Sequence, residues 1–295
     1  MPFTTDSTGN IFIGASYDMS VATFAADLDA ALTQAFGAGN YATQNLSATR
    51  STLAGFRLEF RPQGVGETLS GTITPNTNQA LYREDLAVLH ANARLGVIPF
   101  NLNSSGCSQL AIRAGANPLY VTASTTRTLD NNYTRFLATI TPKEIIFLAA
   151  HTDWSNSMIS YIGVLQNSST PFGFPVNCAG FTKHFVSNSS HFETYLAPWV
   201  DQSAGSLLTP NYAPACQAGT GTFGTDLWMS DFVFRHNRVL NNYPFIGHPN
   251  NLRIAVGASV TVGNLYRYPE GSASPYWLCI GTASSDKKLM MRIKT

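Results

Sequence analysis

The sequence is poor in charged residues. Asp, Glu, Lys and Arg make up 12% of its 295 residues, about half of the 25% or so that soluble domains carry on average. Asn, Thr, Ser and Gly stand where charged residues are usual, as in the segments 68–78 and 101–106. Because the cores of protein interfaces are depleted in charge and enriched in aromatic residues, this composition favours a component of an assembly. A secreted, β-rich globular protein is the alternative that shares the bias.

The sequence also lacks basic clusters and long apolar stretches. Its net charge is +1, and no run of Lys or Arg exceeds two residues. Proteins that bind nucleic acids or anionic membranes concentrate basic residues on one face or segment, so neither partner is expected. No stretch reaches the roughly 18 apolar residues of a membrane span, and residues 1–10 lack the basic start and apolar run of a signal peptide. We therefore expect a protein that is made, and assembles, in a cytoplasm.

Cysteine is scarce and dispersed. The four cysteines, Cys107, Cys178, Cys216 and Cys279, contain no C-x-x-C pair. Zinc ribbons and redox motifs require close spacing, so the pattern supports neither. Reduced, half-buried thiols are the expectation for a cytoplasmic product.

The clearest predicted element is a helix over residues 20–36. Its apolar residues recur with a period of three and four, Ser20 is a suitable N-cap, and Gly37 with Gly39 provides the end. Residues 55–60 alternate apolar and polar side chains and predict a strand, and residues 80–94 suggest a second helix. The apolar positions of the first helix are Val21, Phe24, Ala25, Leu28, Ala31, Leu32, Ala35 and Phe36.

Further along the chain, strands dominate without a regular alternation with helices. This order predicts an α+β fold, with N-terminal helices, a mixed or antiparallel sheet, and a β-rich, loop-rich C-terminal half. The breaker-rich segment 167–177 is the expected boundary between an α+β domain, residues 1–166, and a β-rich domain with long loops, residues 167–295. Strands are expected at residues 96–100, 118–122, 136–140, 144–150, 158–166, 227–234, 252–258, 276–281 and 288–294.

Two glycine motifs resemble nucleotide-binding loops, but their context excludes that function. Residues 219–224 fit the G-x-G-x-x-G pattern, yet two prolines and no apolar strand precede them. Residues 37–42 follow a predicted helix, whereas the phosphate-binding loop must follow a strand. No cofactor-binding residue is therefore predicted.

The end of the predicted strand 144–150 carries the residues that most deserve a chemical interpretation. His151 and Asp153 would share one side of an extended chain and could hold a metal or orient an imidazole as a general base. No neighbouring H-x-H or E-x-x-H pattern completes a set of ligands. We favour the interpretation in which both side chains bond to loop backbone while Trp154 packs.

The other histidines, His184, His191, His236 and His248, are scattered singly. A nucleophile elbow, a metalloprotease helix and a P-loop are all missing from the sequence. We accordingly predict no catalytic and no metal-binding residues, and a protein that is not an enzyme. A hydrolase of unfamiliar type stays a second alternative, since isolated acids could form a carboxylate pair in the fold; the candidates are Glu144, Asp153, Glu193 and Asp201.

Aromatic residues interleaved with polar ones offer another alternative, a carbohydrate- or receptor-binding module. Such residues occur at 195–201 and at Tyr276 and Trp277, and aromatic rings can stack on sugars, although they more often fill cores and interfaces. The two hypotheses differ for the largest of these side chains: an assembly subunit should cover them, and a sugar-binding module should line an open groove with at least two. The residues concerned are Trp199, Tyr212, Trp228 and Tyr276.

Four segments carry a resemblance to a known class of proteins, namely residues 149–163, 243–257, 276–282 and 289–295. In their general choice of residues they resemble the structural proteins of tailed-bacteriophage virions, of the neck, tail or baseplate type. The resemblance implies a virion protein that binds copies of itself and other virion proteins and is assembled in the host cytoplasm. Long loops such as 202–225 would then be arms that pack on neighbouring subunits. Neither nucleic acid nor a membrane is implied as a partner.

Overall fold

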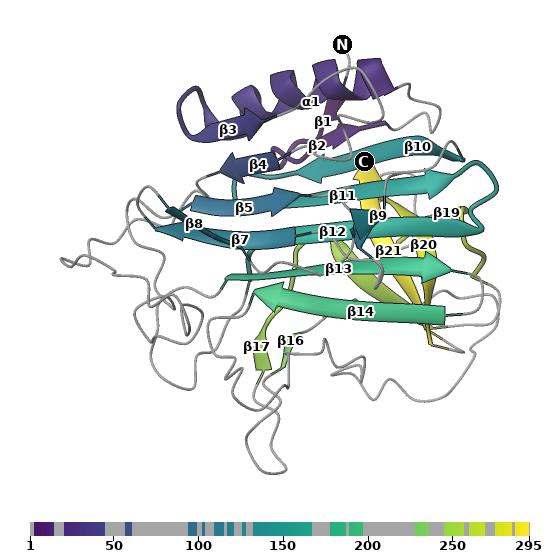
Figure 1. Ribbon diagram of the computed structural model, residues 1–295. Coiled ribbons are helices and arrows are strands. Elements are labelled where there is room, and N and C mark those ends of the chain that lie inside the picture. Colours follow the sequence, from purple (N-terminus) through teal and green to yellow (C-terminus); the bar gives the residue numbers. More distant parts are fainter. Residues whose placement is uncertain are drawn as a thin grey trace, which may run out of the picture.

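The computed structural model describes residues 3–14, 21–44, 57–60, 94–98, 102–103, 109–114, 117–120, 126–127, 132–166, 178–186, 189–196, 228–232, 234–235, 245–256, 260–268, 275–284 and 287–294. Within these ranges the chain is mostly β, with one N-terminal helix, α1 (Val21–Phe36) (Figure 1). Every strand pair in the described sheets is antiparallel. The fold prediction is therefore confirmed in part: the described residues form one N-terminal helix and antiparallel sheets and are mostly β, whereas further N-terminal helices and a loop-rich C-terminal half stay predictions.

The largest sheet has seven strands and forms the centre of the fold. It joins the N-terminal hairpin to a meander of long strands, each paired with the next. Its strands, in spatial order, are β1 (Phe3–Thr5), β2 (Ile11–Ile13), β10 (Tyr133–Ile140), β11 (Glu144–His151), β12 (Asn156–Val164), β13 (Cys178–Val186) and β14 (Ser189–Leu196).

Two five-stranded sheets and two short ladders complete the described structure. The C-terminal sheet runs β15 (Trp228–Asp231), β18 (Leu252–Val256), β21 (Lys287–Lys294), β20 (Tyr276–Ser284) and β19 (Leu265–Arg267). The other five-stranded sheet runs β3 (Tyr41–Gln44), β4 (Arg57–Phe60), β5 (Arg94–Ile98), β7 (Gln109–Ala114) and β8 (Asn117–Tyr120). The ladders are β6 (Leu102–Asn103) with β9 (Thr126–Arg127), and β16 (Phe234–Arg235) with β17 (Phe245–Gly247).

The central strands are buried on both faces, which explains their continuous apolar runs. In β11, Phe147 packs with α1 on one face of the sheet, whereas Ile146 and Leu148 pack against the C-terminal sheet on the other. All eight residues of β11 are buried. Since successive side chains of a strand point to opposite faces, a strand between two layers needs apolar residues at nearly every position. The fold is therefore a helix, a sheet and a second sheet in three layers around β10, β11 and β12.

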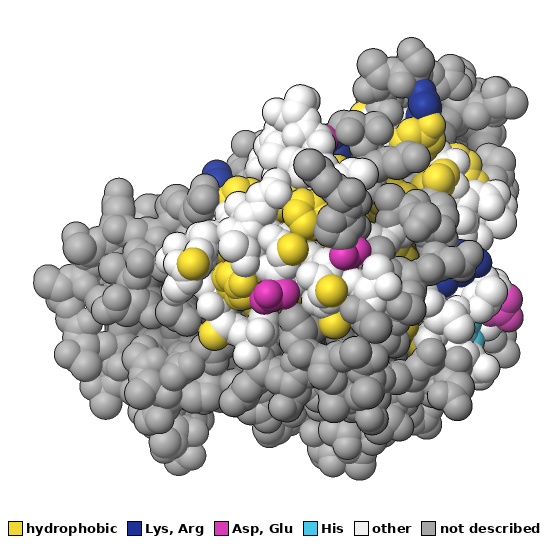
Figure 2. All heavy atoms as spheres, turned by 90° about the horizontal axis from the view of Figure 1, so that it is seen from above, with side chains coloured by type: hydrophobic (Ala, Val, Ile, Leu, Met, Phe, Trp, Pro, Cys, Tyr) yellow, Lys and Arg dark blue, Asp and Glu magenta, His cyan; other side chains and the backbone are white. Residues whose placement is uncertain are grey.

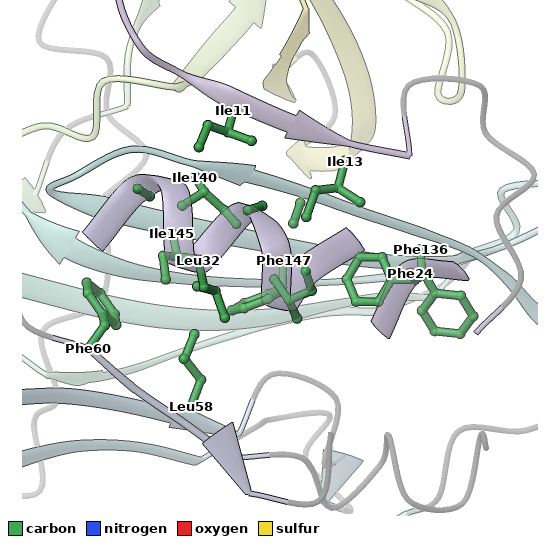
Figure 3. Packing of buried hydrophobic residues seen from close by; sticks show 14 of the residues in the cluster. Ile11, Ile13, Phe24, Leu32, Leu58, Phe60, Phe136, Ile140, Ile145 and Phe147 are labelled. Atoms are coloured by element: carbon green, nitrogen blue, oxygen red, sulfur yellow. The ribbon is translucent and has the colours of Figure 1, made fainter. Parts of the chain in front are cut away.

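The layer between α1 and the seven-stranded sheet is made of closely packed aromatic and aliphatic side chains (Figure 3). Phe24 of α1 lies 5.8 Å from Phe136 of β10, measured between ring centroids, and Phe36 lies 4.9 Å from Phe60 of β4. The helix prediction from apolar periodicity is confirmed, because these are the residues that the periodicity placed on one face. Burial of each such aromatic side chain stabilises the fold by roughly 1.5–3 kcal/mol.

Most predicted strands coincide with observed ones, but several observed strands had not been predicted, and the longest of these are β13 and β14. Their sequences mix Thr, Lys, His and Ser with aromatic residues, so no alternation or apolar run indicated them. The predicted second helix, 80–94, lies outside the described residues except Arg94, which begins β5. The loop 202–225 also lies outside them.

The proposed boundary segment 167–177 is outside the described residues as well. The division into residues 1–166 and 167–295 stays a prediction. The strands on either side of that segment, β12 and β13, pair along their whole length in the seven-stranded sheet.

Candidate functional site

The turn between β11 and β12 contains the residues that sequence reasoning singled out. His151 is buried, with 8% of its surface exposed, and the ring of Tyr133 meets its imidazole edge-on at 4.5 Å between centroids. Its Nδ1 lies 3.3 Å from both Ser155 Oγ and Asn156 Nδ2. The imidazole is therefore held by side chains of its own hairpin.

The Asp153 carboxylate is hydrogen-bonded within its own turn. Its Oδ1 accepts hydrogen bonds from the backbone N–H and the hydroxyl of Ser155, at 3.0 and 2.7 Å. These bonds lower the pKa of the Asp153 carboxyl, and the charge of His151 adds a smaller effect in the same direction. The side chain is exposed and closes the turn locally. The structure thus brings His151 and Asp153 into one turn.

Trp154 completes the turn in an unusual backbone conformation, with φ of 61°, which is rare for a bulky residue. Its indole lies against Gly263 of the C-terminal half, where a Cβ would come within 2.5 Å of the ring. Arg135 places its guanidinium 5.3 Å from the ring centroid and donates from Nε and Nη2 to the carbonyl of Thr152. An indole with these neighbours is occupied in packing, as the sequence interpretation expected.

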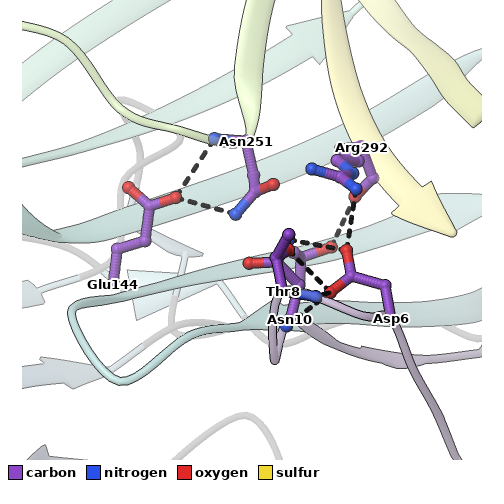
Figure 4. Close-up of polar contacts among 7 residues, drawn as sticks. Asp6, Thr8, Asn10, Glu144, Asn251 and Arg292 are labelled. Carbon is purple, nitrogen blue, oxygen red and sulfur yellow. Dashed lines mark hydrogen bonds and ion pairs between the residues drawn. The ribbon is translucent and has the colours of Figure 1, made fainter. Parts of the chain in front are cut away.

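Glu144, at the opposite end of β11, is the most unusual titratable group of the described structure. It is 1% exposed, and its carboxylate accepts hydrogen bonds from the backbone and side-chain amides of Asn251, at 3.1 and 3.0 Å (Figure 4). It also accepts one from the backbone N–H of Asn250, at 3.1 Å. Burial raises its pKa to about 7, and the hydrogen bonds, including one from Tyr161, oppose that rise. Catalytic acids often have such raised pKa values, so this residue requires a specific test.

Among the candidate acids whose side chains the structure describes, none lies at the distance of a glycosidase partner from Glu144. Glycosidases place two carboxyl groups about 5–9.5 Å apart. Asp153 lies in the turn beyond the far end of the same strand, whose residues from Glu144 to His151 already span about 23 Å at the 3.3 Å rise per residue of a strand. Glu193 is in β14, and Asp201 is outside the described residues. Sequence reasoning named Glu144 only as one possible acid; its partners, more than 100 residues away in the chain, carry no signal that would have indicated them.

A second buried carboxylate joins the two ends of the chain. Asp6 accepts hydrogen bonds from Thr8 and Asn10 within its own turn and from Arg292 of β21 at 2.7 Å (Figure 4). Burial alone would raise the pKa of Asp6, but the hydrogen bonds outweigh it and hold the pKa below its ordinary value. The carboxylate is satisfied by structural donors, and the N-terminal hairpin is thereby fixed to the C-terminal strand.

A third cluster lies where β15 meets β18. Asp231 pairs with Arg253 across the two strands, and His248 Nε2 lies 3.9 Å from the same carboxylate. The Nδ1 of His248 lies 3.1 Å from the Pro249 carbonyl. The arrangement ties the segment before β18 to an edge of the C-terminal sheet.

The described residues contain no group of three His, Cys, Asp or Glu side chains that could hold a metal ion. Cys279 is a free, buried thiol whose pKa burial raises to about 11, so it is a poor nucleophile at neutral pH. One pairing was missed from the sequence: His184 and His191, interpreted there as isolated, lie opposite each other in the register of β13 and β14. That register depends on where the β13–β14 turn falls, which no residue pattern indicated.

Of the aromatic residues that distinguish assembly from sugar binding, the structure describes the side chain of Tyr276. It is partly buried, with the Arg267 guanidinium 4.4 Å from its ring centroid. Trp228 begins β15, whereas Trp199 and Tyr212 lie outside the described residues. The contrast between the two hypotheses stays a prediction.

Comparison with known proteins finds no relative: no protein-family model matches the chain, and no curated protein or solved structure is significantly similar to it. None of the helical residues that the structure describes forms a segment long and apolar enough to cross a membrane.

Proposed function

We propose that this chain is a structural subunit of a tailed-phage particle, in the neck, tail or baseplate, which acts through contacts with copies of itself and with other virion proteins. It would be assembled in the host cytoplasm and would have no catalytic role. The observation that carries the proposal is the low charge of the chain, 12% of all residues, since desolvating a neutral surface against a neighbour costs less than desolvating a charged one.

The exposed side of α1 is one surface that carries little charge. Its described exposed side chains are small or neutral apart from Asp29. Figure 2 shows the molecule from above, and few of the described side chains on that face are charged. A face of this kind can be covered by a neighbouring subunit without burying unpaired charges. The exposed residues of the helix are Thr23, Ala26, Asp29, Ala30, Thr33 and Gln34.

The use of buried polar groups supports the same proposal. Glu144 and Asp6 are fully hydrogen-bonded to donors that hold layers together, and Ser157 donates from β12 to the Ile280 carbonyl of the C-terminal sheet at 2.7 Å. A catalytic site leaves some polar groups free to meet a substrate. These three side chains instead hold neighbouring elements of the fold together.

A cryo-EM map of the native particle tests the proposal. We expect the chain inside a neck, tail or baseplate ring, with Trp228 and Tyr276 covered by its own core or by another chain. A chain that projects at a tip, with an open aromatic groove, would instead support the receptor- or carbohydrate-binding alternative. A chain missing from purified particles, as judged by mass spectrometry, would contradict the proposal outright.

A further inference from the structure

The strands β13 and β14, at one end of the seven-stranded sheet, bring two histidines together (Figure 1). His184 and His191 are direct register partners, and the register around them runs without a bulge from Thr182 to Val186. Positions directly opposite each other in an antiparallel pair have Cβ atoms about 4.5–5.5 Å apart. Two of the six histidines of the chain therefore occupy adjacent positions on neighbouring strands.

Glu193 shares a face of the sheet with this pair. It follows His191 by two residues in β14, and residues two apart on a strand belong to the same face. Its register partner is Thr182, which precedes His184 by two residues. Positions at this diagonal offset on neighbouring strands are about 7–8 Å apart. Two imidazole-bearing residues and one carboxylate-bearing residue thus occupy a compact triangle of positions on one face.

The face in question is the one on which α1 packs further along the sheet. His184 pairs with Met158 of β12, which belongs to the hydrophobic core beneath α1, whereas the next residue, Phe185, belongs to the core on the opposite face. Across the sheet, the row of register partners that contains Met158 begins with Ala149 on β11 and continues to His184 and His191. This row is apolar on β11 and β12 and becomes polar at β13.

Two imidazoles and one carboxylate are a known ligand set for Zn²⁺. Zinc sites with two His and one Glu hold the ion through three side chains, at bond lengths of about 2.0–2.2 Å, and leave a fourth tetrahedral position open. Imidazole nitrogens suit Zn²⁺, whereas Mg²⁺ and Ca²⁺ require oxygen ligands. The residue types and their spacing on the two strands therefore match a zinc ion better than any other common divalent metal of the oxygen-binding class.

We propose that the juxtaposition of His184, His191 and Glu193 is a Zn²⁺ site that joins β14 to β13. The register of the two strands carries the proposal, since the structure describes these three positions by their backbone; they are not among the described side chains, in which no metal-binding group of three occurs. The proposal replaces the sequence-based expectation of no metal ligand, because spacing along the chain does not reveal partners across strands. It is independent of the proposed assembly role.

Isothermal titration calorimetry of the full chain, first freed of metal with a chelator, tests the site with ZnCl₂. We expect one Zn²⁺ per chain and no binding of Mg²⁺ at the same concentration. His184→Ala and His191→Ala should each weaken Zn²⁺ binding by about 100-fold or more, because even residues that only support a metal ligand contribute about 10–100-fold. As the matched control, His236→Ala removes a histidine that belongs to neither strand and should leave the affinity unchanged.

Two further readouts keep the test decisive. Since an ion that binds only the folded chain stabilises it, excess Zn²⁺ should raise the Tm of the wild-type chain and of His236→Ala but not that of His191→Ala. X-ray absorption at the zinc edge of the wild-type complex needs no variant and should show two imidazole ligands. A wild-type chain that does not bind Zn²⁺, or a zinc shell without imidazole, would overturn the proposal. Binding that persists in both histidine variants would show an adventitious ion only and would overturn it as well.

Discussion

The ion pair between the N-terminal hairpin and the last strand gives the sharpest stability prediction. The Asp6 side chain is fully buried, and Arg292 is 16% exposed. Replacing Asp6 with Asn keeps the shape and an acceptor for Thr8 and Asn10, but leaves the Arg292 guanidinium without a counter-charge. Breaking a buried pair in this way costs about 3–5 kcal/mol. Since the retained acceptor offsets part of the loss, we expect about 3 kcal/mol, which lowers Tm by roughly 6–10 °C.

A double-mutant cycle isolates the contribution of the pair. Arg292→Met keeps an unbranched apolar stem near Phe12, over whose ring the guanidinium now lies at 5.9 Å. Denaturant unfolding of the two single variants and the double variant should give a coupling energy of about 2 kcal/mol, within the usual range for residues in contact. A loss below 1 kcal/mol in Asp6→Asn, or a coupling energy near zero, would refute this reasoning.

The same carboxyl predicts how stability depends on acid. Because the folded-state pKa of Asp6 lies below its ordinary value of 3.8, its contribution is fully present above pH 3.8 and is lost as the pH falls through the folded-state pKa. The Tm of the wild-type chain, measured by thermal unfolding, should therefore fall steeply below about pH 4. Asp6→Asn should show a shallower decline over that range; an equally steep one would assign the acid sensitivity to another group.

Two further predictions concern packing in the C-terminal half. Gly263→Ala should destabilise the protein by about 2–3 kcal/mol in denaturant unfolding, because the position has a positive φ of 87° and a Cβ would meet the Trp154 ring at 2.5 Å. Gly9→Ala is the matched control. Since that position has a φ of 82° with open space around it, the substitution should cost only about 1 kcal/mol. An equal loss in the two variants would mean that the indole does not press on Gly263. Cys279 should resist thiol reagents at pH 8 in the native protein and react after unfolding, since it is buried and the pKa of its thiol is raised to about 11; rapid native labelling would contradict its burial.

The sequence predicted those helices and strands whose residue pattern is typical of a single kind of local structure. The helix at Val21–Phe36 follows from a periodic apolar face, and the strand at Glu144–His151 follows from an apolar run of β-forming residues. Both patterns arise because neighbouring layers cover these elements. The strands β13 and β14 lack such patterns because their composition is polar. They form strands nevertheless, since β13 pairs with β12 and β14 pairs with β13 within the sheet.

The buried carboxylates could not be predicted from the sequence in the same way. Glu144 begins a strand next to a turn, where an exposed acid is the usual case. Its burial results from donors at Asn250 and Asn251, and only the packing of the two sheets brings them together. Asp6 likewise acquires its ion pair from Arg292, 286 residues away. A contact of this range leaves no local signature in a single sequence.

Light scattering of the purified chain, coupled to size-exclusion chromatography, tests the central claim most directly. If the chain is an assembly subunit with neutral contact faces, it should form a closed oligomer whose mass is a fixed multiple of 31.9 kDa. That mass should not change between about 0.05 and 0.5 M salt, because screening weakens charged contacts and leaves neutral ones intact. A strictly monomeric species at all concentrations and salt levels would contradict the account.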